Sequence, residues 1–232
     1  MPAKKSPKLF PADLYELTPE DKNRFADEQA LGMVAPNDPI LVKKAAAVDP
    51  KTIGSGRIAD VVQRLLATAG GQQQADPSGK KLRLLVGLAG PQIGESLRIV
   101  VADTKILPSR KKAGKLECFI NPQIIWRSRE TDELREGCFS AGPVWGLVRR
   151  PIAVKIRAFT PDGQKVERIF EDFTARIMQH EIDHLDGIRF PDRIQNDRKR
   201  HWVHAEEIPL YPEHINHWPR LCSLARWHDF IA

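Results

Sequence analysis

Apolar residues recur at helical spacing in two segments of the chain. In residues 56–68 they are Ile58, Val61, Val62, Leu65 and Leu66. The second segment, residues 173–188, has the same spacing. We expect Asp172 or Thr174 to cap the start of this second helix and Gly187 to end it, since these residue types favour those positions.

Short runs rich in β-branched and other apolar residues predict strands between and after these helices. They cover residues 97–103, 118–126, 152–159 and 166–170. The turn sequence Pro161-Asp162-Gly163 joins the last two runs as a hairpin. Helices and strands that do not alternate regularly indicate an α+β fold.

The second helical segment carries a candidate metal site. His180 and His184 are four residues apart, so they lie on one face of a helix and can bind one ion together. Glu181 lies beside that face, where its carboxylate can take a proton from water. These residues predict a metal-dependent hydrolase.

Two histidines leave the site incomplete, because a catalytic metal usually has three protein ligands and one open position. His201 and His204 follow the motif but belong to a different segment. Cys138 is the better candidate, because a thiolate is a strong ligand for zinc or ferrous iron. Cys118 and Cys222 are expected to be small, buried apolar residues.

A third segment, residues 85–94, is rich in small residues and contains Gln92, an amide donor. In order and spacing, the three segments resemble the motifs of the peptide deformylase family. That family carries a glycine-rich motif ending in Pro-Gln, then Glu-Gly-Cys-x-Ser, then Gln-His-Glu-x-Asp-His-x-x-Gly. The last two match in full here, at residues 136–140 and 179–187, and the resemblance extends from about residue 34 to residue 194.

The resemblance implies a fold and a metal centre. Mixed or antiparallel strands would pack around the central helix that carries the His-Glu-x-x-His motif. Cys138, His180 and His184 would bind one divalent ion, natively Fe²⁺, although these ligands also suit Zn²⁺, Ni²⁺ or Co²⁺. Glu181 would act as general base toward water and then as acid toward the departing amine.

The resemblance also implies how substrate is held. Gln92 and the backbone amide of Phe139 would stabilise the oxyanion. Further expected substrate-binding residues are Val86, Gly87, Ile177 and Glu136. Of these, Val86 and Gly87 would pair with the peptide backbone and Ile177 would line a methionine pocket. The reaction would be hydrolysis of N-formylmethionyl nascent peptides to formate and a free N-terminus.

Three positions depart from the family pattern. Leu85 replaces a glycine, Gly90 replaces an alanine, and Trp145 stands where a basic or small residue is common near the substrate entrance. Two alternatives to the deformylase hypothesis follow. One is a divergent amide hydrolase with altered substrate preference. The other is a catalytically inactive, ribosome-associated binding protein with a structural metal.

Length and composition indicate how many domains the chain forms. A chain of 232 residues with 41% apolar content can form one domain with a substantial core. We expect a catalytic domain at 34–195 with a polar insertion at 70–81, an N-terminal extension at 1–33 and a tail at 196–232.

Three cysteines, one of them expected to be a metal ligand, favour a reducing compartment. No apolar core follows the basic residues at the N-terminus, so it is not a secretory signal, and the acidic residues between positions 13 and 21 count against an organellar transit peptide. We therefore expect the bacterial cytoplasm rather than an organelle.

The tail offers possible partners. Basic residues cluster at Arg193, Arg198, Lys199 and Arg200, which would suit contact with ribosomal RNA, although a packing tail is the simpler interpretation. Its histidines lack the further ligands of a second metal site, and its tryptophans are expected to pack on the core. Neither DNA nor a membrane is expected as a partner.

Overall fold

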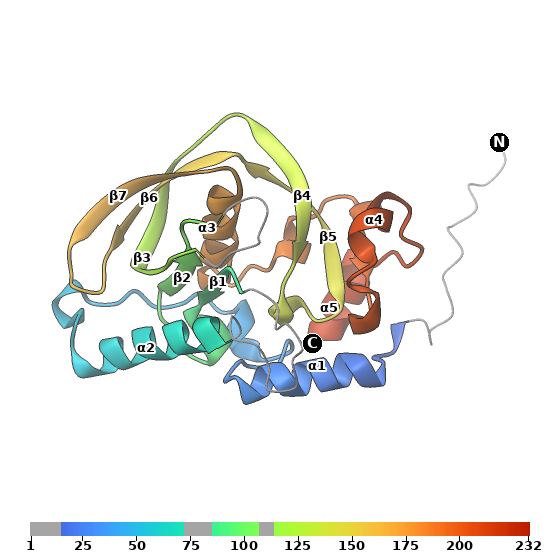
Figure 1. Ribbon diagram of the computed structural model, residues 1–232, viewed down its shortest axis with the longest axis horizontal. Coiled ribbons are helices and arrows are strands. Elements are labelled where there is room, and N and C mark those ends of the chain that lie inside the picture. Colours follow the sequence, from blue (N-terminus) through green and yellow to red (C-terminus); the bar gives the residue numbers. More distant parts are fainter. Residues whose placement is uncertain (1–14, 72–84, 107–113) are drawn as a thin grey trace.

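Two antiparallel sheets flank one central helix in the computed structural model, which describes residues 15–71, 85–106 and 114–232 (Figure 1). The helices are α1 (Pro19–Ala30), α2 (Gly56–Gly71), α3 (Asp172–Leu185), α4 (Tyr211–His214) and α5 (Leu224–Ile231). The strands are β1 (Gly87–Ala89), β2 (Ile99–Asp103), β3 (Leu116–Arg127), β4 (Thr131–Gly137), β5 (Val144–Pro151), β6 (Ala153–Phe159), β7 (Lys165–Glu171) and β8 (Arg200–Trp202). The α+β class expected from the sequence is confirmed.

The larger sheet has the order β1-β2-β3-β6-β7 and is covered on both faces. All five residues of β2 are buried, and they alternate between the two sides. Val100 and Ala102 belong to the core shared with α3, whereas Ile99 and Val101 belong to the core shared with α2. The smaller sheet, with the order β4-β5-β8, lies on the other side of α3 (Figure 1).

The four predicted strands correspond to β2, β3, β6 and β7, and β6 and β7 form the predicted hairpin. The predicted helix at 56–68 is α2, which continues to Gly71 and so takes up the start of the insertion expected at 70–81. Residues 72–81 lie outside the described part of the chain. Strands β1, β4, β5 and β8 were not predicted.

The prediction of a side-chain cap on α3 is wrong, whereas its predicted end is confirmed. Asp172 is itself the first helical residue, and its N–H donates to the Ile152 carbonyl at 2.7 Å because the chain passes directly from β7 into the helix. The Thr174 hydroxyl donates to the Glu171 carbonyl and accepts no cap bond. At the other end Gly187 has φ +71°, which lets the chain turn out of the helix.

The terminal segments pack on the same side of the molecule as the smaller sheet. Strand β8 pairs with β5, and Trp202, Trp218 and Trp227 are buried, as expected for a packing tail. Helix α1 begins with a capping box between Thr18 and Asp21. Among the described helices, none combines the length and apolar content needed to cross a membrane.

Candidate active site

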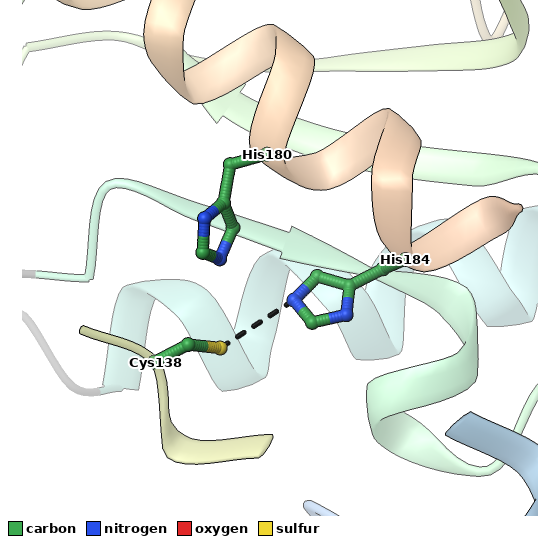
Figure 2. Close-up of side chains that lie close together, drawn as sticks. All are labelled: Cys138, His180 and His184. Atoms are coloured by element: carbon green, nitrogen blue, oxygen red, sulfur yellow. Dashed lines mark hydrogen bonds between the residues drawn. The ribbon is translucent and has the colours of Figure 1, made fainter. Parts of the chain in front are cut away.

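Cys138, His180 and His184 converge on one point, although 42 residues separate the cysteine from the first histidine. Their ligand atoms all lie within 4.8 Å of one another, and Cys138 Sγ is 3.4 Å from His184 Nε2 (Figure 2). Cys138 directly follows β4 in an extended conformation, and both histidines project from α3. The three ligands predicted from the sequence are therefore brought together.

One histidine is oriented by a buried carboxylate. His180 Nδ1 lies 2.8 Å from Glu136 Oε2, which leaves Nε2 directed away from that carboxylate. Arg150 donates to both oxygens of Glu136, at 2.6 and 2.9 Å. Arg176 donates to Oε1 at 2.6 Å. Glu136 also lines the pocket, and both its oxygens bond to protein side chains, one of them to His180.

Charge stabilises this arrangement. Burial by itself would raise the pKa of Glu136, but Arg150 and His180 outweigh it and hold that pKa well below its usual value. Burial by itself would lower the pKa of His180, but Cys138 and Glu136 hold it well above its usual value. The carboxylate is thus kept ionised and aimed at the histidine.

Glu181 lines the same cavity as Cys138 and His180. It is 4% exposed, lines the pocket, and has a buried Oε2 without a hydrogen-bond partner. Burial raises the pKa of Glu181 to about 7, with Glu136 adding to the effect. A Cβ on Gly87 would overlap the Glu181 carboxylate, so the glycine makes room for this side chain. A carboxyl group that titrates near neutrality suits general acid–base work.

Gln92 is fixed with its donor toward the cluster. It sits in the short 3-10 turn at Gly90–Ile93, and its Oε1 accepts from the Ala89 N–H at 2.8 Å. Its Nε2 is therefore turned toward Ser140 Oγ, at 3.1 Å, and Cys138 Sγ, at 3.5 Å. A Cβ at Gly90 would press on the carbonyls of Glu95 and Leu97, which explains glycine at that position.

A cavity of about 190 Å³ opens onto these groups. The predicted residues Val86, Gly87, Ile177 and Phe139 all line it. So do Leu85 and Trp145, two of the three departures from the family pattern. The Trp145 ring is 4% exposed and lies over Gly137, where a Cβ would collide with it.

Two arginines that bond Glu136, Arg150 and Arg176, were not predicted from the sequence. Arg176 lines the cavity one helical turn before His180 and also bonds Asp132 at 2.5 Å. Arg150 bonds Asp183 at 2.8 Å. A charged residue inside an apolar helix face was the available signal for Arg176, but nothing local marks Arg150.

These residues fit a divalent ion. A thiolate and two imidazoles are a common donor set for zinc or ferrous iron, with a fourth position left for water. The Glu136–His180 bond is the kind of support that orients a metal-binding histidine. No second group of this kind occurs among the described residues: His201 bonds Tyr211 and His204 bonds Asp21.

Comparison with known proteins identifies the family. The family model for polypeptide deformylase matches residues 31–200. A peptide deformylase of Pseudothermotoga lettingae is 39% identical over 165 residues, which are 70% of this chain and 81% of that protein. Peptide deformylase 1A of Arabidopsis thaliana, which is chloroplastic and mitochondrial, is 35% identical over 175 residues, 70% of this chain and 60% of that protein.

Comparison with solved structures indicates the same family. A class I type b peptide deformylase of Acinetobacter baumannii bound to Met-Ala-Ser gives a TM-score of 0.60 at 30% identity, over 70% of this chain and 96% of that one. The peptide deformylase of Thermotoga maritima gives 0.58 at 29% identity, over 71% and 97%. The chain belongs to the peptide deformylase family.

Proposed function

We propose that this enzyme hydrolyses the N-formyl group of formylmethionyl peptides, releasing formate and a free N-terminus. One observation carries the proposal. Three metal-binding side chains meet within 4.8 Å, and the unpartnered carboxylate oxygen of Glu181 lines the same cavity. A structural metal site needs neither a free carboxylate nor an open cavity, so this arrangement favours catalysis over a binding role.

Cys138, His180 and His184 would hold the ion, and we infer that it is ferrous in the native enzyme. When bound, the ion supplies an acidified water and polarises the formyl carbonyl. Glu136 keeps His180 in the orientation and tautomer that leave its Nε2 free. The Glu181 carboxylate accepts the proton that the attacking water loses. The same oxygen then delivers that proton to the nitrogen of the departing peptide as the C–N bond breaks.

Gln92 and the Phe139 backbone would stabilise the negative charge that develops on the formyl oxygen. The Gln92 donor is preset, since its carbonyl end is held by Ala89. A preorganised donor of this type typically supplies about 3–4 kcal/mol of transition-state stabilisation. Val86 and Gly87 would pair with the peptide backbone, and their position in the cavity lining at the start of strand β1 supports this role.

Formate release from formyl-Met-Ala-Ser by the ferrous-loaded enzyme under anaerobic conditions tests the function. Glu181→Ala should keep one metal per chain and lose about 10²–10⁴-fold in kcat, because the proton carrier is gone. Cys138→Ala should lose both metal and activity. Turnover that survives Glu181→Ala would contradict the mechanism.

We infer a first-residue pocket, and so a substrate range, that differs from that of other family members. The bulky side chains of Leu85 and Trp145 and the charged side chain of Arg176 all line the cavity. Comparing formyl-Met-Ala-Ser with formyl peptides that begin with larger, smaller or polar residues measures this. Equal rates for all of them would show that no dedicated methionine pocket exists.

We further propose a cytoplasmic enzyme that meets its substrate on nascent chains. The basic residues Arg193, Arg198 and Lys199 would form the ribosome contact; Arg200 is buried and bonds the carbonyls of Pro191 and Ile194, so it is not available. Cosedimentation with ribosomes at rising salt tests this contact.

A further inference from the structure

Helix α1 lies outside the segment that matches the family, yet it borders the catalytic cavity. The match begins at residue 31, and α1 ends at Ala30. Arg24 and Glu28, one helical turn apart on α1, line the cavity together with Cys138 and Glu181. Part of the wall therefore comes from a segment that the family model does not cover.

Contacts with Phe139 and with the tail hold α1 in place. The Phe25 ring packs edge-on against Phe139, with ring centroids 5.9 Å apart. Asp21 is buried and lies 2.7 Å from His204 Nδ1, and it accepts from the Ala205 N–H at 2.8 Å. The helix is thus anchored to the tail on one side and to Phe139 on the other.

One guanidinium nitrogen of Arg24 is available to donate a hydrogen bond to a ligand. Its Nε lies 3.2 Å from Glu28 Oε1, and its side chain is only 14% exposed. Its NH1 is buried and has no hydrogen-bond partner in the part of the chain that the structure describes. A buried donor left unpaired is unfavourable, so an acceptor that enters the cavity would be bound there.

We propose that Arg24 is a substrate-binding residue that donates to an oxygen of the peptide downstream of the formylated residue. This proposal rests on the proposed function, because it concerns the same cavity. A peptide in the cavity presents backbone carbonyls at every residue and, in a short substrate, a terminal carboxylate. The guanidinium of Arg135 also lines the cavity, with its Cζ 5.9 Å from the centroid of the Trp145 ring. It adds a further positive charge to the cavity wall. The N-terminal extension thereby supplies part of the specificity for peptide length.

Arg24→Gln tests the proposal, with Lys22→Gln as the matched control. Lys22 lies on the same helix but is exposed and does not line the cavity. The substrates are formyl-Met, formyl-Met-Ala and formyl-Met-Ala-Ser, the last as free acid and as C-terminal amide. Wild type and Lys22→Gln should gain kcat/KM with length. Arg24→Gln should lose about 10-fold or more on the tripeptide, mainly in KM, with little change on formyl-Met.

The two forms of the tripeptide identify the oxygen. A loss confined to the free acid assigns the terminal carboxylate, and an equal loss on the amide assigns a backbone carbonyl. An unchanged length dependence in Arg24→Gln overturns the proposal. Unfolding temperature and metal content, which should match wild type, exclude a general loss of structure.

Binding of the product peptide Met-Ala-Ser, measured by calorimetry on the metal-loaded protein, separates this proposal from the catalytic one. Weaker binding by Arg24→Gln than by Lys22→Gln supports the role of Arg24 even if no variant releases formate. Equal affinities, or no binding by wild type, overturn it. Absence of formate release by wild type would instead count against the proposed function.

Discussion

Glu136 is a buried side chain that orients His180, one of the proposed metal ligands. Its four hydrogen bonds come from Arg150, Arg176 and His180, so the ligand's orientation depends on residues from β4, β5 and α3. A carboxylate in such a position must stay ionised, and Arg150 ensures this by holding its pKa low. Substitution of Glu136 should therefore act on the metal before it acts on substrate.

Glu136→Gln is expected to weaken metal binding by about 10–100-fold, because the amide cannot accept bonds from all three partners. Competition with a chromogenic chelator measures this affinity. Glu133→Gln is the control, since Glu133 lies on the same strand and pairs with Lys199 and Arg149 near the surface. Such a pair contributes about 1 kcal/mol or less to stability. Equal metal affinity in both variants would mean that Glu136 does not support His180.

The three cysteines should differ sharply in reactivity. Burial raises the pKa of both Cys118 and Cys222 to about 12, so neither forms a thiolate in the folded protein at pH 8. Cys138 lines the cavity and is only partly buried. Iodoacetamide followed by mass spectrometry should label Cys138 alone, and only after chelation of the metal. Labelling of Cys118 or Cys222 before unfolding would contradict the burial of these thiols.

The end of α3 fixes the position of the second histidine. The N–H groups of Gly187 and Ile188 donate to the carbonyls of His184 and Asp183, which closes the helix immediately after the proposed metal ligands. A Cβ at Gly187 would lie 2.6 Å from the Val42 carbonyl oxygen, and φ there is +71°. Both facts require glycine.

Gly187→Ala should therefore destabilise the fold by about 1–2 kcal/mol from the left-handed backbone alone, with the clash adding to it. Gly70→Ala is a suitable contrast: Gly70 lies within α2, and a Cβ there meets nothing within 4 Å. That change should stabilise α2 by up to about 1 kcal/mol. Urea denaturation measures both values, and a neutral Gly187→Ala would show that the turn tolerates a side chain.

The elements that the sequence predicted are those whose pattern is local. The strands β2, β3, β6 and β7 have apolar runs, and the β6–β7 hairpin has its own turn signal. Strand β4 is rich in charge, with Asp132, Glu133, Arg135 and Glu136, because it pairs with an arginine-bearing β5 and packs against the polar side of α3. A strand whose partners are charged rather than apolar gives no hydrophobic period to detect.

The same distinction applies to the site as a whole. Cys138, His180, His184, Glu181 and Gln92 stand in recognisable motifs, and the fold brings them together as expected. Arg150 and Arg24 carry no local signal, because their roles depend on contacts between segments far apart in the chain. The residues of the candidate metal centre could be predicted from the sequence. The residues that form the outer wall of the cavity could be identified only from the three-dimensional structure.

The described N-terminal segment, from Tyr15 to the end of α1, packs against the C-terminal tail, and α1 contributes to that outer wall. Tyr15 packs edge-on against Trp202 and donates its hydroxyl hydrogen bond to the Leu221 carbonyl at 2.9 Å. Asp21 and His204 form a buried pair at 2.7 Å. Tyr15 packs onto the same apolar cluster as Trp202 and Trp227 of the tail. The N-terminal segment and the tail should therefore depend on each other for stability.

Asp21→Ala tests this dependence. It removes the buried carboxylate that bonds His204 and the Ala205 N–H, together with the α1 capping box, so we expect a loss of about 1–3 kcal/mol in the stability with which α1 and the tail hold each other. Limited proteolysis should then cut near residues 201–232, while the metal stays bound to Cys138 and the two histidines. Asp27→Ala is the control, because Asp27 is exposed on the same helix. If α1 is released, the variant should also lose affinity for Met-Ala-Ser, as expected for Arg24→Gln. Resistance of the tail to protease in Asp21→Ala would show that the tail holds without α1, and the two ends would then be independent additions to the catalytic domain.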